Sequence, residues 1–456
     1  MPNNAVRLVV KLLVASLSVS VVFAVLTLVF LPSDITTWTR SVLVLLVAML
    51  YVRIARQLLA GVAGAYRRVR ILSALGFVAV AWLLVSGAYP GWLRGVQVVQ
   101  LALLGALIVA VNRRVVREAF PRVPDTRPRN RRAALLLVVL VPLVAELSMG
   151  NIPLSMLWVL PIFAPIYSGG ALLIREVVRR TGGGLANMLI LGVAYGLVEE
   201  GLVLQGLTSH HLYGAAEWAP RILGVNSAYT VLNLVYHPVF SIVVPIVLVE
   251  HFFGRGLYLR RGGVIASGVV AVLGALVLRV AVPPTEDPGY TVPMVAAVVI
   301  AVLAVVVIVA GLRVRVPRGR VLTPPRVPVA AGIAGVTTFG FFMLLWPLGD
   351  AKHSLFTDGG FWALVAVIAA LALVAAAAYV LRRWSVAWTP GHLFGVAIGA
   401  LVGHTLFAVV GNADTWADRA TLLGIAAVTV AAGFTRRRAT PESADVSPTT
   451  PAATSR

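Results

Sequence analysis

Long apolar stretches separated by short polar connections dominate this sequence. Most of the stretches are close to the ~20 residues that an α-helix needs to cross the apolar core of a bilayer. We count fourteen of them, at residues 9–31, 38–55, 71–89, 95–112, 133–149, 154–174, 185–207, 227–253, 263–282, 292–312, 328–348, 360–381, 391–411 and 418–434. The pattern therefore predicts an all-α, polytopic integral membrane protein with about 14 transmembrane helices.

The polar connections divide the chain into parts of different character. Residues 1–112 contain four predicted membrane helices, and residues 113–132 form an Arg- and Pro-rich cytoplasmic linker. Residues 133–255 carry most of the polar groups found inside apolar stretches, and residues 256–438 form the C-terminal membrane helices. Residues 439–456 are Pro, Ser, Thr and Ala with few apolar side chains, so we expect a disordered tail.

Composition supports the same class of protein. Hydrophobic residues make up 59% of the chain and charged residues only 12%, a balance that the core of one soluble domain cannot accommodate. Cysteine is absent, which excludes disulfides, thiolate metal sites and a cysteine nucleophile. Any bound metal would have to be held by His, Glu, Asp or Asn side chains.

The basic residues that give the chain its net charge of +21 lie mainly in the loops between the apolar stretches. If every stretch crosses the membrane, one set of alternate loops and the two termini carry nearly all of the 38 Lys and Arg residues. The opposite loops carry only Arg40, Arg94, Arg221, Arg279, Lys352 and Arg419. This asymmetry predicts a multi-pass protein of the plasma membrane with both termini in the cytoplasm. We therefore expect contact with anionic membrane lipids and no binding of nucleic acid.

Two adjacent acids, Glu199 and Glu200, interrupt the apolar stretch at residues 185–207. A carboxylate at membrane depth costs at least ~2.5 kcal/mol on insertion scales, so acids in this position are expected to be paired or functional. Successive side chains of an α-helix point about 100° apart, so we expect one acid to face a site and the other to support it. Two ionised carboxylates this close would repel unless a proton, a protonated histidine or a metal ion compensates.

The next apolar stretch carries a polar stripe. Its members are three or four residues apart and share one face of a helix: Asn226, Thr230, Asn233, His237 and Ser241. His237 is roughly 15 Å, and Glu200 roughly 10 Å, from the outer end of its helix, so the two are level in the outer half of the bilayer. We expect this face to turn toward Glu200. His404, on a later helix, has a similar predicted depth.

A glutamate with a nearby histidine can hold a divalent metal and activate water for hydrolysis, and it can also relay protons. The candidate catalytic residues are Glu199, Glu200 and His237. The candidate ligands for a divalent metal such as zinc are His237, His404 and Glu200. Three further polar groups are predicted to support the site: Asn233, Gln205 and Glu146. Other charged residues lie near predicted helix ends, where solvated or snorkelling charge is expected: Arg175, Glu176, Glu250 and His251.

The stretch Glu199-Glu200-Gly-Leu-Val-Leu-Gln205-Gly206, followed by His237 on the next membrane helix, resembles the intramembrane CAAX protease and bacteriocin-processing enzyme family. That family is marked by EExxxR on one helix, FxxxH on a following helix and a later HxxxN. The resemblance covers roughly residues 133–255. It implies a metal-dependent intramembrane peptidase that acts on a membrane peptide or protein.

The motifs of that family are incomplete in this chain. Leu204 stands at the Arg position, Asn233 stands at the Phe position, and no HxxxN follows His237. The pattern therefore predicts a divergent or catalytically degenerate relative. The alternative is a multi-pass secondary transporter with a titratable carboxylate pair, which the number of predicted helices favours. A purely structural role for the polar groups, as hydrogen bonds between helices, is a third interpretation.

The loop charges give the first testable prediction. With the basic loops in the cytoplasm, Ser209 and Arg456 lie on opposite sides of the membrane. Fusions of a side-specific reporter at these two positions should therefore give opposite signals in intact cells. Signals from the same side at both positions would rule out the arrangement of fourteen crossing helices.

Overall fold

The computed structural model is helical over most of the residues that it describes. The structure describes residues 4–30, 51–85, 89–120, 129–214, 219–315, 323–345, 361–384 and 388–434. Within these ranges, eleven helices are long and apolar enough to cross a membrane. An all-α, multi-pass membrane protein is therefore confirmed, while the number of fourteen helices and the sides of the termini stay predictions.

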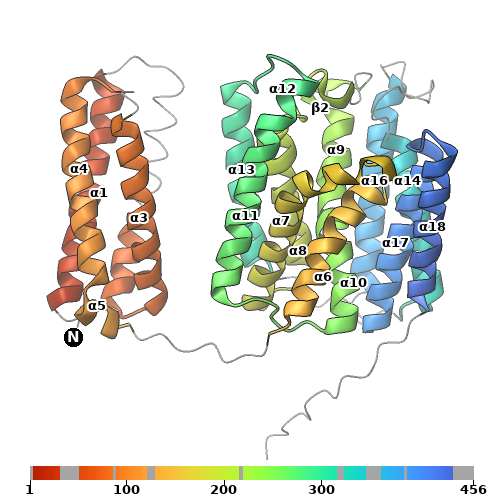
Figure 1. Cartoon of the computed structure of the whole chain (residues 1–456), viewed down its shortest axis with the longest axis horizontal. Helices are drawn as coiled ribbons and strands as arrows, with labels where there is room; N and C mark the ends of the chain where they lie inside the picture. Colours follow the sequence, from red (N-terminus) through yellow and green to blue (C-terminus); the bar gives the residue numbers. More distant parts are fainter. Residues whose placement is uncertain are drawn as a thin grey trace, which may run out of the picture. The chain divides into compact units, whose positions relative to one another are not determined.

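The chain divides into two compact units, Met1–Thr126 and Arg127–Arg456. The helices of the first unit are α1 (Asn4–Phe30), α3 (Ala63–Val85), α4 (Gly91–Asn112) and the short α5 (Arg114–Glu118). In this unit α4 packs against both α1 and α3 (Figure 1). The predicted helix at residues 38–55 lies mostly outside the described residues, and the predicted tail at residues 439–456 lies entirely outside them.

The second unit is a larger helical bundle. Its helices are α6 (Arg131–Pro142), α7 (Leu160–Arg180), α8 (Leu185–Gly196), α9 (Ser227–Tyr236), α10 (Val244–Phe253), α11 (Arg261–Ala281), α12 (Pro283–Glu286), α13 (Met294–Arg313), α14 (Val327–Leu345), α16 (Phe361–Trp384), α17 (Pro390–Gly411) and α18 (Trp416–Gly433). The described part of this unit also contains two short 3₁₀ segments, η2 (Leu154–Val159) and η4 (Leu212–Gly214), and a small antiparallel hairpin of β1 (Arg221–Ile222) and β2 (Val225–Asn226).

Two of the predicted membrane stretches are helices that fall short of a full span. The stretch at residues 133–149 folds as α6, which ends at Pro142, followed by one wider turn. The stretch at residues 418–434 folds as α18, which has 18 residues and starts with the polar turn that contains Asp418 and Arg419. Pro142 therefore ends α6 early, and the charged residues of the first turn shorten the apolar part of α18.

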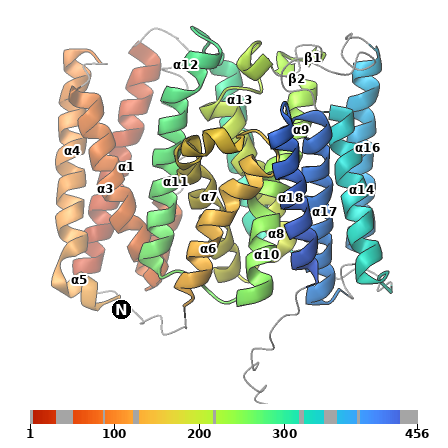
Figure 2. The same ribbon diagram turned by 45° about the vertical axis from the view of Figure 1, so that its right-hand side comes forward.

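The most buried part of the second unit is formed by three spans. In an apolar 18-residue part of each span, 78% of the residues are buried for Ser227–Phe253, 67% for Pro390–Gly411 and 61% for Leu185–Val203, whereas 17% are buried for Met294–Arg313. Figures 1 and 2 show α9 and α10 in the middle of this unit, with α11 and α13 on one side and α14, α16, α17 and α18 on the other. The polar residues of the inner spans are consequently shielded from lipid.

Helices α14 and α17 pack with their backbones in contact. Small residues recur every four positions on both helices, at Ala331 and Gly335 of α14 and at Gly399 and Gly403 of α17. A Cβ atom on Gly403 would lie 2.1 Å from the carbonyl oxygen of Gly335, and one on Gly399 would lie 2.0 Å from that of Ala331. The two backbones can approach this closely only because no side chain intervenes, as in other membrane interfaces of small residues.

This packing predicts that Gly403→Ala destabilises the second unit. The added methyl group would force α14 and α17 apart, and overpacking of this kind typically costs about 1–3 kcal/mol. The matched control is Gly424→Ala, because a Cβ atom on that helical glycine meets nothing within 4 Å. The free energy of unfolding in mixed micelles should fall for Gly403→Ala and should not fall for Gly424→Ala. Equal effects of the two substitutions would contradict the tight interface.

Candidate functional site

Three helices of the second unit widen into π-helical turns, and each turn carries one or more of the candidate polar residues. The turns are η1 (Leu143–Leu147) after α6, η3 (Leu197–Val203) after α8, and η5 (His237–Val243) between α9 and α10. Glu146 lies on η1, Glu199 and Glu200 lie on η3, and His237 begins η5. π-Helical turns are rare and are found mostly at functional sites.

The chain gives a local reason for two of these turns. Pro142 immediately precedes η1, and Pro238 is the second residue of η5. Proline has no N–H to complete the regular i to i−4 ladder of the helix, so the backbone finds other partners nearby. In η3 the amide of Leu204 donates to the carbonyl oxygen of Glu199, five residues earlier, at 2.8 Å.

His237 is clamped between the two adjacent glutamates. Its Nε2 atom is 3.0 Å from Oε1 of Glu200, and its Nδ1 atom is 3.3 Å from Oε2 of Glu199. The hydroxyl of Ser241, one turn further along, is 3.1 Å from the same Nδ1 atom. We expected one acid to face the site and the other to support it. Instead both carboxylates approach the same ring, because the wide turn of η3 reduces the angle between successive side chains.

The protonation state of this clamp decides which hydrogen bonds its members form. A neutral imidazole donates from one nitrogen only, and an ionised carboxylate can only accept. A neutral His237 with its proton on Nε2 can donate to Glu200 and accept from Ser241 at Nδ1, whereas a hydrogen bond between Nδ1 and Glu199 requires a further proton on the ring or on Glu199. The arrangement Glu200–His237–Glu199 is therefore a buried unit of three titratable groups in contact with one another.

The hydrogen bonds of the two glutamates differ. Oε2 of Glu200 accepts a hydrogen bond of 2.8 Å from the hydroxyl of Tyr229. A Cβ atom on Gly206 would lie 2.6 Å from the ring of Tyr229, so the glycine makes room for this tyrosine. Among the described residues, Glu199 has no hydrogen bond comparable with that of Glu200 to Tyr229. The contacts of its buried carboxylate are with Nδ1 of His237 at 3.3 Å and with Tyr195.

A third acid and a ring of tyrosines complete the site. Glu146 is buried and accepts a hydrogen bond of 3.2 Å from Asn151, and its carboxylate interacts electrostatically with His237 and Glu200. The His237 ring lies 5.5 Å from the ring of Tyr236 and 5.6 Å from that of Tyr195, measured between centroids, and the Tyr167 ring is also close. Sequence analysis missed these tyrosines, although Tyr195 lies one turn before Glu199 and therefore on the same helical face.

The structure brings His404 into contact with none of the three acids, so its role as a metal ligand stays a prediction. It is fully buried among aromatic rings, with its own ring 4.3 Å from that of Phe240. Its Nδ1 atom lies 3.4 Å from the hydroxyl of Ser148, and its Nε2 atom lies 3.5 Å from the hydroxyl of Tyr236. Within the described part of the chain, no group of three or more His, Asp or Glu side chains is arranged to hold a metal ion.

The two other supporting residues stabilise the backbone instead of contacting the acids. Asn233 donates a hydrogen bond of 3.1 Å to the carbonyl oxygen of Tyr229, on its own helix. Gln205 ends the helix with a positive φ of 66°, and its side-chain oxygen accepts a hydrogen bond of 2.7 Å from the amide of Val292. Both residues therefore hold the elements that carry Glu200 and Tyr229 in place.

A second charged cluster lies where α7 and α10 end. The guanidinium group of Arg175 is fully buried, with its Nη1 2.7 Å from Oε1 of Glu176 and its Nε 3.1 Å from Oε1 of Glu250. Its plane covers the ring of Tyr258 at 3.1 Å from the centroid. Burial raises the pKa of the Tyr258 hydroxyl above its usual range, although the positive charge of Arg175 acts in the opposite direction.

Two more arginines close this cluster. Arg179 Nη2 is 2.5 Å from Oε2 of Glu250, and Arg180 Nη2 is 3.3 Å from Oε2 of Glu176. The expectation of solvated or snorkelling charges for Arg175, Glu176 and Glu250 is therefore wrong. The loop after α10 folds back over them, and the amide of Tyr258 donates to Glu176 at 2.8 Å.

The chain belongs to an uncharacterized membrane protein family, whose sequence model matches residues 135–437. The match includes every residue of the clamp and of the charged cluster. Comparison with curated proteins and with solved structures finds no match. The family match identifies a different family from the CAAX proteases and bacteriocin-processing enzymes, so the resemblance inferred from the paired glutamates is wrong.

The buried charged cluster predicts a large loss of stability for Arg175→Gln. Removing one partner of a buried ion pair typically costs about 3–5 kcal/mol, because the remaining charge is left uncompensated. The matched control is Arg255→Gln, since Arg255 is 62% exposed and lies 4.0 Å from the same Glu250. Exposed pairs contribute at most about 1 kcal/mol. Unfolding in mixed micelles should therefore separate the two variants, and equal losses would refute the structural role of Arg175.

Proposed function

We propose that this protein is a proton-coupled secondary transporter, in which the Glu200–His237–Glu199 clamp binds the coupling proton. The observation that carries the proposal is the excess of acid over base in a buried site. Glu146, Glu199 and Glu200 lie around a single histidine, and no ion pair links any of them to an arginine or lysine of the described chain.

Charge balance supports proton binding at this position. If all three acids and the histidine were ionised, the site would carry a net negative charge in a region where uncompensated charge is expensive. Protonation neutralises this charge without further changes in the site, because a bound proton needs no additional ligands. Such a site takes up protons to become stable and can redistribute them between neighbouring groups. These two properties suit coupling to a proton gradient.

The helices that carry the site support the same function. Secondary transporters place their coupling residues on interrupted helices near the middle of the membrane. Here Glu146, the Glu199–Glu200 pair and His237 each lie on a π-helical turn, two of them next to a proline. Such turns have a weaker hydrogen-bond ladder than a regular helix and are therefore suitable points for movement.

Metal-dependent hydrolysis of membrane peptides is less well supported by this geometry. Both ring nitrogens of His237 already face carboxylates, so a metal ion would have to displace one of those contacts. The third ligand that was predicted, His404, lies among aromatic rings instead. We therefore treat a bound zinc ion and peptide cleavage as outcomes that would contradict the transporter proposal.

Substitution of the clamp tests the proposal. Glu200→Gln keeps the size of the side chain and an acceptor for Tyr229 but removes the titratable group. In liposomes that contain the full-length protein, an imposed pH gradient with a metabolite mixture should drive proton currents in wild type. The currents should fall to the level of empty liposomes in Glu200→Gln. Infrared difference spectra across a pH step should lose a carboxyl band in the same variant.

The matched control is Glu118→Gln, since Glu118 is a 63% exposed carboxylate that belongs to the first unit, whereas the clamp belongs to the second. It should change neither the currents nor the carboxyl band. The proposal would fail if Glu200→Gln kept wild-type currents. It would also fail if purified wild type contained stoichiometric metal and cleaved a membrane-peptide library while Glu200→Gln did neither.

A further inference from the structure

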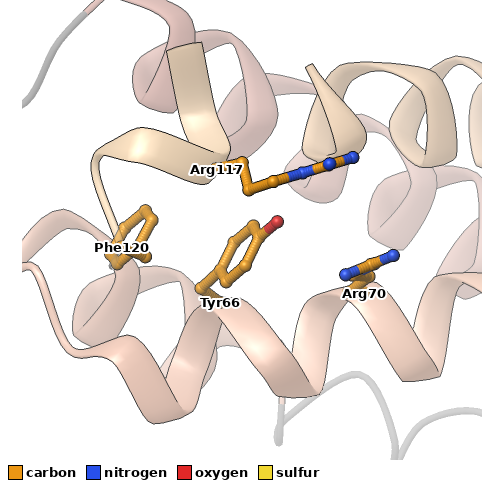
Figure 3. Close-up of a pocket in the computed structure, with 4 residues that line it drawn as sticks. All are labelled: Tyr66, Arg70, Arg117 and Phe120. Atoms are coloured by element: carbon orange, nitrogen blue, oxygen red, sulfur yellow. The ribbon is translucent and has the colours of Figure 1, made fainter. Parts of the chain in front are cut away.

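A pocket of about 280 Å³ lies in the first unit, at the start of α3 and beside α5. Four residues line it: Tyr66, Arg70, Arg117 and Phe120. Figure 3 shows the hydroxyl of Tyr66 on the side of the ring that faces both arginines. No part of this pocket belongs to the Glu–His clamp, which lies in the other unit.

The side chain of Tyr66 is buried, and its hydroxyl has no hydrogen-bond partner among the described residues. Its ring stacks on Phe120 with centroids 5.0 Å apart and planes within 4° of each other. The residue is 5% exposed, and its hydroxyl forms no hydrogen bond with any described residue. A buried donor without a partner typically costs about 1–3 kcal/mol. Because the ring is stacked, its hydroxyl stays at the pocket, where a ligand with acceptor atoms would supply the missing hydrogen bond.

The two arginines bring uncompensated positive charge to the same space. Arg70 is one helical turn after Tyr66, on the same face of α3, and it forms no ion pair with any described residue. Arg117 donates to the carbonyl oxygen of Asn112 at 3.3 Å, which leaves most of its five donors available. The neighbouring acid, Glu118, is already paired with Arg114 at 2.7 Å.

We propose that this pocket binds a phosphate group through the guanidinium groups of Arg70 and Arg117 and the hydroxyl of Tyr66. Planar guanidinium groups match the oxygen atoms of phosphate, and hydrogen bonds between charged groups are about twice as strong as neutral ones. The group belongs to an anionic lipid headgroup or to a free phosphate compound. The loop charges predict that this end of α3 faces the cytoplasm, where anionic lipids are enriched.

Binding to the full-length protein in detergent tests the site. The probes are inorganic phosphate and dioctanoyl phosphatidic acid, with dioctanoylglycerol as the matched lipid that lacks phosphate. Affinity is measured from the shift of the melting temperature with ligand concentration, and lipid binding also by native mass spectrometry. Tyr66→Phe keeps the stack on Phe120, and Arg70→Gln keeps the helix. Each should weaken phosphate binding about tenfold, the effect of losing roughly one charge-assisted hydrogen bond.

The control variant is Arg67→Gln, since Arg67 lies on the same helix with the same charge but does not line the pocket. It should bind both probes as wild type does. Binding of phosphatidic acid alone identifies a lipid headgroup as the ligand, and binding of inorganic phosphate as well identifies free phosphate. The proposal is overturned if folded wild type binds neither probe, if dioctanoylglycerol binds equally well, or if Arg67→Gln weakens binding as much as Arg70→Gln.

Discussion

A charge inside an apolar bundle has to be paired or neutralised, and this chain meets that requirement in two different ways. In the cluster at the ends of α7 and α10, Arg175, Arg179 and Arg180 compensate Glu176 and Glu250 directly. In the clamp, Glu199 and Glu200 share one histidine. The first arrangement has a fixed charge whatever the pH near neutrality, because arginine does not lose its proton. The second arrangement has a charge that depends on how many protons it holds.

The charged cluster and the clamp also differ in the helices that carry them. The charged cluster joins α7, α10 and the loop that contains Tyr258 through several short ion pairs and hydrogen bonds. Its helices are regular α-helices at this point. The clamp instead lies on π-helical turns, where the regular ladder is interrupted. The unit thus has a network of arginine ion pairs on regular helices at one place and a contact between titratable groups on interrupted helices at another.

Apolar periodicity predicted the helices well, since the length of an apolar run is a property of the sequence alone. The contact between Glu200 and His237 was also predictable, because both belong to consecutive helices and were estimated to be level in the membrane. Lateral packing was not predictable in this way. His404 has the same estimated depth, but the rings of Phe240 and Phe342 enclose it. Depth in the membrane does not determine the lateral position of a side chain, and the ligands of a metal site must agree in both.

Burial of the charged cluster was missed for a related reason. Arg175 and Glu250 are at the ends of apolar runs, where solvation is the ordinary outcome. Their burial depends on the loop that folds back to place Tyr258 over Arg175, and apolar periodicity contains no information about such a loop. The π-helical turns are equally invisible to it, although Pro142 and Pro238 mark two of them. No proline marks the third turn, η3. There the adjacent side chains of Glu199 and Glu200 both approach the ring of His237.

The tyrosines around the clamp support its acids without adding charge. The hydroxyl of Tyr229 stabilises the carboxylate of Glu200 by donating a hydrogen bond, but it adds no positive charge. An arginine in the same place would stabilise the ionised form so strongly that the acid could not readily take up a proton. The rings of Tyr195 and Tyr236 also enclose His237 without contributing charge. Neutral donors and aromatic walls thus support the acids while leaving protons to balance their charge.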